Sequence, residues 1–115
     1  YLDIFFKTKR LVITTNYSFR KKIMASFTNN DKVKYTIIKR RPHKIYDADG
    51  LCDPPDYKNP KIHVAQDLPP KREMAVVLEE IMHAFFWDIS EKEVRKFCST
   101  ATRILHKDGW RKTNI

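Results

Sequence analysis

The run from Val76 to Trp87, VVLEEIMHAFFW, restricts the fold of this chain more than any other segment. Its apolar residues are dense enough for a buried helix, yet Glu79, Glu80 and His83 lie in its middle. Burying one carboxylate without a partner costs free energy, and burying two beside an imidazole costs more. The run therefore predicts a helix whose three ionisable side chains either reach water or bind something.

The spacing of the apolar residues predicts that this helix covers residues 71–88, with Asp67 as a candidate cap. One broad apolar face collects Met74, Val77, Leu78, Ile81, Met82 and Phe85. The three ionisable residues share a different arc, which is about 100° wide on a helical wheel. We expect a central helix that packs through its apolar face and lines a cleft with the other side.

A second helix is expected almost directly after the first. Ser90 and Glu93 have the S-x-x-E spacing of a capping box, and Gly109 is well placed to end the helix. The apolar stripe consists of Val94, Phe97, Cys98, Ala101, Ile104 and Leu105. Because only Ile89 separates the two helices, the chain must turn sharply and the helices must pack on each other.

Short strands are expected before the helices. In residues 32–40, Val33, Tyr35 and Ile37 lie on one side of an alternating pattern, and residues 61–65 form a second short strand. Residues 44–60 are dense in Asp, Gly and Pro, which predicts a hairpin followed by a loop. A length of 115 residues gives room for one domain. The expected fold is α+β, with a small antiparallel sheet packed on the central helix and a second, C-terminal helix completing the core.

Composition excludes a membrane span and a disulfide scaffold. No apolar run approaches the roughly 18 residues that a spanning helix needs, so no membrane partner is expected. The two cysteines, Cys52 and Cys98, lack the spacing of a disulfide framework or of a CxxC pair. A reducing, cytoplasmic compartment is therefore expected.

Positive charge is concentrated at the start of the chain. The net charge is +9, and residues 1–45 carry 12 Lys and Arg against 2 acids, whereas the remainder carries 11 against 12. Two clusters are candidates for contacts with nucleic-acid phosphates, and they comprise Arg20, Lys21, Lys22, Lys39, Arg40 and Arg41. A solvated basic surface is the simpler explanation of the same residues, and both explanations stay open.

Residues 1–30 are expected to form a basic N-terminal extension, and residues 31–115 the folded domain. The chain begins at Tyr1, and the sequence at Met24 resembles a translation start. The segment before Met24 has three explanations: a mistranslated leader, a piece of a longer protein or a genuine extension.

The ionisable residues of the first helix have the spacing of a metal site. Glu79 and His83 are four residues apart and project together, so both can bind one metal ion. Glu80 points to the flank of that ion, where a carboxylate can take a proton from metal-bound water. Glu91, at the start of the second helix, is the candidate third ligand. The alternative is a solvated helix face on which Glu91 only interacts with the helix dipole.

The segment AVVLEEIMHAFFWDISEKEVRKFCSTATRIL resembles the active-site helix pair of small zinc metallopeptidases of the IrrE-like and SprT-like kind, common in phages and bacteria. That family carries H-E-x-x-H on one helix and a glutamate ligand at the start of the next. The resemblance covers residues 45–111 and implies a minimal zincin-like fold, in the host cytoplasm if the chain is phage-encoded. It implies that Glu80 is the general base and that His83 and Glu91 are ligands. Glu79 stands where the family has histidine.

Glu79 changes the chemistry that the resemblance implies. Zinc or manganese is the expected ion, since two carboxylates and one histidine favour harder ions such as Mn²⁺ or Mg²⁺ more than a two-histidine site does. The added negative charge also makes the ion a weaker Lewis acid. The implied function is metal-dependent hydrolysis of a peptide or protein substrate at the degenerate motif EEIMH. One alternative is an inactive, metal-free domain of this fold that binds nucleic acid or an acidic partner through its basic N-terminal part. A structural or adaptor protein is another.

Overall fold

The structure is a computed structural model that describes residues 22–113. Most of the expected N-terminal extension, including Arg20 and Lys21, lies outside the described residues. The strands are β1 (Lys22–Thr28), β2 (Lys34–Lys39), β3 (Gly50–Cys52) and β4 (Lys61–Val64). The helices are the short 3-10 turn η2 (Lys44–Tyr46), α1 (Pro70–Phe85) and α2 (Glu91–Lys107).

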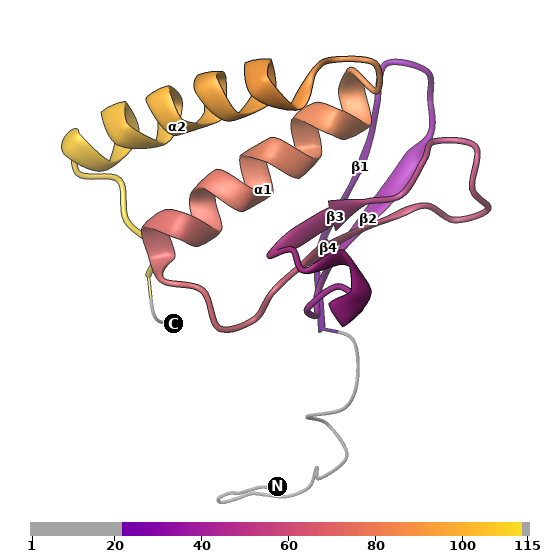
Figure 1. Cartoon of the computed structure of the whole chain (residues 1–115), viewed down its shortest axis with the longest axis horizontal. Helices are drawn as coiled ribbons and strands as arrows, with labels where there is room; N and C mark the ends of the chain where they lie inside the picture. The colour runs from indigo at the N-terminus through magenta and orange to yellow at the C-terminus, as the bar shows by residue number, and fades with distance from the viewer. Residues whose placement is uncertain (1–21, 114–115) are drawn as a thin grey trace, which may run out of the picture.

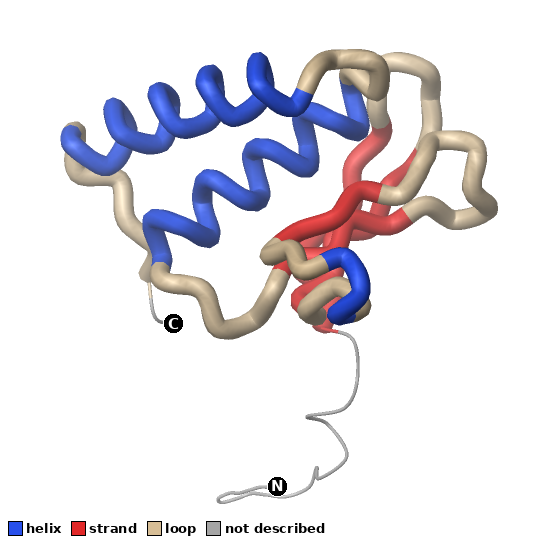
Figure 2. The backbone as a smooth tube through the Cα atoms, viewed as in Figure 1, coloured by secondary structure: helices blue, strands red, loops and turns tan. Residues whose placement is uncertain are grey.

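Strands and long helices form separate layers. In Figure 1 the strands lie together on one side of α1, and α2 lies on its other side. Figure 2 shows the same division, with the strands in red and the helices in blue. α1 contacts β3 and β4 as well as α2. The expected α+β class and the central position of the first helix are therefore confirmed.

The sheet is mixed. Its strand order is β1-β2-β4-β3, with an antiparallel pair at each edge and the parallel pair β2–β4 in the middle. The sequence did not indicate the parallel pair, which arises because the β3–β4 hairpin returns the chain alongside β2 in the same direction. β1 begins at Lys22, so the sheet includes residues that were assigned to the extension.

The core lies between the sheet and α1. Its buried cluster consists of Tyr35, Ile37, Cys52, Ile62, Val64, Val76 and Ala84. Tyr35 and Ile37 are buried on the same side of β2, as their alternation predicted. The ring of Phe27 stacks on both Tyr35 and Phe85, with centroid separations of 5.6 Å in each pair. These stacked rings join β1, β2 and the end of α1.

α1 buries a different side from the one expected. Its buried residues are Glu73, Val76, Glu80 and Ala84. Val77 and Ile81 of the expected face pack at the border of the core, but Met74 and Leu78 line an apolar cavity beside Trp110. The prediction was wrong because apolar residues surround nearly the whole helix. A helical wheel then cannot select the side that meets the sheet.

α2 begins and ends as its local signals predict. The Ser90 hydroxyl accepts a hydrogen bond from the Glu93 amide at 3.1 Å and donates one to its carboxylate at 2.9 Å. Gly109 takes a φ of 102° just beyond the helix. Of the expected stripe, Val94 and Cys98 are fully buried, whereas Phe97 and Ile104 are 58 % and 54 % exposed. The expectation that Phe97 and Ile104 face the core was wrong, because α1 covers only a narrow line of α2. That line consists of Val94, Cys98 and Thr102.

A buried ion pair ties β2 to α1. The Lys39 ammonium donates to the Glu73 carboxylate, and Lys112 donates to the same carboxylate at 3.0 Å. Burial alone would raise the pKa of Glu73, but the hydrogen bonds from Lys39 and Lys112 hold it below its ordinary value. Glu73 is therefore ionised at neutral pH, and both lysines stabilise its charged form.

Lys39→Met is expected to destabilise the protein by about 3 kcal/mol at pH 7, because it leaves a buried carboxylate with one partner fewer. Urea denaturation measures this loss. Lys58→Met, in an exposed loop, is the control and should change stability by less than about 0.5 kcal/mol. The double variant Lys39→Met/Glu73→Leu should recover most of the loss. Equal effects of Lys39→Met and Lys58→Met would contradict the assignment.

Candidate active-site cleft

A cavity of about 470 Å³ opens between β3, the C-terminal half of α1 and the start of α2. We call it the β3–α1 cleft. Its lining includes Gly50, Cys52, Glu80, His83, Trp87 and Glu91. The structure therefore brings Glu80, His83 and Glu91 to one cavity, although they come from two helices. Glu79, the fourth candidate, is not part of this lining.

Glu80 is the most buried carboxylate of the cleft, with 9 % of its surface exposed. Burial, assisted by the charges of Glu79 and Glu91, raises the pKa of Glu80 to about 8. No described residue donates a hydrogen bond to its carboxylate. A carboxyl group in this setting exchanges a proton near neutral pH, which is the property that a general base or acid needs.

Gly50 allows β3 to pass directly over Glu80. A Cβ atom on Gly50 would lie 2.5 Å from Cγ1 of Val76 and 2.9 Å from Oε2 of Glu80. Any side chain at this position would therefore push β3 away from α1. No local signal in the sequence indicated that Gly50 sets the width of the cleft.

Cys52 is a neutral packing group of the cleft. Burial first, and the charge of Glu80 second, raises the pKa of its thiol to about 12. Since the reactive form of cysteine is the thiolate, Cys52 is unsuited to act as a nucleophile at neutral pH.

His83 and Glu91 are in direct contact. The Nε2 atom of His83 lies 2.7 Å from Oε1 of Glu91, and Arg95 lies 3.6 Å from the other oxygen of that carboxylate. The short turn between the helices places the first residue of α2 beside the last turn of α1. The sequence anticipated this approach, although the expected single residue between the helices was wrong: residues 86–90 separate them.

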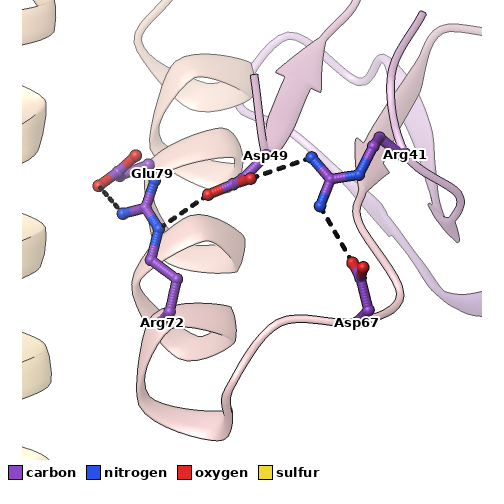
Figure 3. A network of polar contacts seen from close by, with 5 residues as sticks. All are labelled: Arg41, Asp49, Asp67, Arg72 and Glu79. Atoms are coloured by element: carbon purple, nitrogen blue, oxygen red, sulfur yellow. Dashed lines mark hydrogen bonds and ion pairs between the residues drawn. The ribbon is translucent and has the colours of Figure 1, made fainter. Parts of the chain in front are cut away.

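Glu79 is oriented toward a different neighbour. Its carboxylate lies 3.9 Å from Arg72, one end of a chain of ion pairs in Figure 3. Arg72 contacts Asp49 at 3.2 Å, Asp49 contacts Arg41 at 3.1 Å, and Arg41 contacts Asp67 at 3.0 Å. Burial raises the pKa of Glu79, whereas Arg72 opposes this rise. Sequence reasoning missed Arg72, although its position two helical turns before Glu79 was a usable signal.

The expected cap of α1 was wrong. Asp67 pairs with Arg41 rather than with the helix, and the residue at the N-cap is Pro69, which makes no side-chain hydrogen bond. The side chain of Asp67 is thus drawn to the loop before η2. This pairing also lowers the pKa of Asp67, chiefly through the hydrogen bond from Arg41.

His83 and Glu91 are chemically suitable ligands for a divalent ion. Of the three candidate ligands, these two are in contact with each other. A histidine nitrogen and a carboxylate oxygen 2.7 Å apart face one cavity, and both are ordinary zinc ligands. Within residues 22–113, however, no three His, Cys, Asp or Glu side chains are grouped closely enough to hold a metal. The missing member is Glu79, which is paired with Arg72.

Two residues of the basic clusters proposed to contact nucleic acid are neutralised by carboxylates of the same domain. Lys39 is buried against Glu73, and Arg41 is paired with two aspartates. Arg40 is exposed, and Lys22 is placed only as the first residue of β1. Lys39 and Arg41 are therefore committed to contacts within the domain.

Comparisons with protein-family models, with curated proteins and with solved structures returned no match for this chain. Among the described residues, no helix combines the length and the hydropathy that crossing a membrane requires. The resemblance to small metallopeptidases therefore stays a hypothesis that depends on the motif and on the cleft.

Proposed function

We propose that the β3–α1 cleft is the active site of a metal-dependent hydrolase that cleaves peptide bonds. One observation carries the proposal: a deeply buried Glu80 and the contacting pair His83–Glu91 line the same cavity. A buried carboxyl with a raised pKa beside a histidine–carboxylate pair is the arrangement that water activation requires.

Each residue has a distinct role in this proposal. His83 and Glu91 would hold the ion, and Glu79 would become the third donor on leaving Arg72. When bound, zinc or manganese supplies a water of lowered pKa and polarises the substrate carbonyl. Glu80 would accept the proton of the attacking water and pass it to the leaving amine.

The free edge of β3 is the proposed docking site for the substrate. β4 cannot take this part, because it lies between β2 and β3 and has no free edge. β3 has one neighbour among the described strands and borders the cleft. An extended peptide that pairs with β3 is brought past Glu80 by its backbone hydrogen bonds, which suits cleavage with little dependence on sequence.

The decisive test is metal binding by the purified chain. Wild-type protein incubated with zinc or manganese and then desalted is expected to retain about one equivalent, because His83 and Glu91 already face one cavity and Glu79 can complete one site by leaving Arg72. Elemental analysis measures the ratio. His83→Ala should lose the metal, whereas His106→Ala, on α2 away from the cleft, should retain it. A wild-type protein that retains neither ion would contradict the proposal.

A further inference from the structure

A second cavity lies between β1, α1 and the segment that follows α2. It measures about 520 Å³ and shares no lining residue with the β3–α1 cleft. After α2 the chain turns back toward the first turn of α1 (Figure 1), where the Lys112 ammonium donates to the Glu73 carboxylate at 3.0 Å. Residues 110–112 thus form one wall of this cavity, which we call the tail cavity.

Most of the lining of the tail cavity is apolar. Its apolar side chains come from β1, α1 and the segment after α2, and they are Met24, Pro70, Met74, Val77, Leu78 and Trp110. Met74 and Leu78 are one helical turn apart, and neither belongs to the buried core or to its border. Cavities of roughly 300–1,000 Å³ with apolar walls and a few charged groups are the usual form of small-molecule sites.

Three cationic groups and one carboxylate complete the lining. The buried Lys39 balances the charge of Glu73, so the charge of Lys112, which contacts the same carboxylate, is in excess. Arg111 donates only to two backbone carbonyls and forms no ion pair with a described residue. The tail cavity therefore has two more positive than negative side chains, and both Lys112 and Arg111 are exposed to solvent.

This charge decides between the candidate occupants. The 21 residues that precede β1 include apolar side chains, but they carry five Lys and Arg against one acidic residue. A second copy of the chain would bring a net charge of +9. Both are repelled by a positive lining, whereas an anionic partner is attracted. The apolar walls require that this partner also has an apolar body, and the volume suits a small molecule.

We infer that the tail cavity binds a free medium-chain carboxylate. Its hydrocarbon chain lies against Met74, Leu78 and Trp110, and each methylene removed from water strengthens binding. Its carboxylate accepts charge-assisted hydrogen bonds from Lys112 and Arg111. This site does not depend on the proposed metal site, because the two cavities share no residue.

The test is a titration of the full-length, metal-free chain with decanoate, followed by NMR of ¹³C-labelled methionine methyl groups. Of the three methionines, Met24 and Met74 line the tail cavity and Met82 does not. We expect saturable shifts of the Met24 and Met74 signals while the Met82 signal stays in place. Hexanoate, with four methylenes fewer, should bind at least about tenfold more weakly. No saturable binding, or equal shifts of all three signals, would overturn the inference.

A cationic analogue and a variant test the role of charge. Decyltrimethylammonium has the same chain with the opposite charge and should bind at least about tenfold more weakly than decanoate. Arg111→Gln should weaken decanoate binding by roughly three- to tenfold. Lys92→Gln, exposed at the other end of α2, should bind decanoate like the wild type. Equal affinities for the two amphiphiles would overturn the inference, as would binding to phosphatidylglycerol vesicles without binding of free decanoate.

Discussion

Glu80→Gln is expected to stabilise the metal-free protein at pH 8 and to flatten its dependence on pH. The pKa of Glu80 is about 8 in the folded chain, against an ordinary value of 4.5. Between these two values the folded state binds more protons than the unfolded state, so Glu80 lowers stability as the pH rises. The penalty is absent below pH 4.5 and fully present above pH 8. From pH 5.5 to 8.5 it amounts to about 3 kcal/mol.

Urea denaturation of chelator-treated protein between pH 5.5 and 8.5 measures this effect. The stability of the wild type should fall across the range, and that of Glu80→Gln should change much less. Asp88→Asn removes an exposed carboxylate from the turn between the helices and should follow the wild type. Parallel curves for the wild type and Glu80→Gln would mean that the carboxyl ionises freely in the folded protein.

The same variant separates stability from catalysis. In the metal-loaded protein, Glu80→Gln should retain the metal and lose hydrolytic activity by about 10²- to 10⁴-fold, the usual contribution of a general base. Activity that survives in this variant would assign proton transfer to another group, even if the folding data agree with a buried carboxyl.

Gly50→Ala is expected to destabilise the protein by about 2–3 kcal/mol, because the new methyl group overlaps Val76 and Glu80. The melting temperature should fall by roughly 10–15 °C in a domain of this size. The effect depends on close approach and not on backbone strain. Thermal unfolding followed by circular dichroism measures it.

A double-mutant cycle identifies the source of the loss. Val76→Ala removes the nearest clashing atom, so the two substitutions together should cost less than the sum of their separate costs, by at least about 1 kcal/mol. Gly109→Ala is the matched control. Its Cβ meets nothing within 4 Å, and its cost comes from its φ of 102°. That cost should add to the cost of Val76→Ala without coupling.

Local signals predicted both ends of α2, whereas α1 ends at Phe85 rather than at residue 88 and is not capped by Asp67. The capping box of Ser90 and Glu93 and the terminating Gly109 are set by neighbouring residues, and each lies where the sequence placed it. The proximity of His83 and Glu91 followed from the same kind of argument, since a very short turn leaves few arrangements for its flanking residues.

Contacts between distant segments were not predictable in the same way. Lys39 and Glu73 are 34 residues apart, and neither has a neighbour in sequence that indicates the other. The buried side of α1 depends on where β3 passes, and that path depends on Gly50. The pairing of Glu79 with Arg72 decides which candidate ligands meet, and it draws on the loop residue Asp49.

The mixed sheet has a consequence for the order of folding. The two antiparallel pairs join residues close in sequence, such as Thr28 with Lys34 and Cys52 with Ile62. The parallel pair joins Thr36 to Lys61 and closes a much longer loop. Loop closure loses more chain entropy as the loop lengthens, so the two hairpins should form early and meet late. The β3–α1 cleft is built on the β3–β4 hairpin. It can therefore assemble with α1 before β2 and β4 pair and complete the sheet.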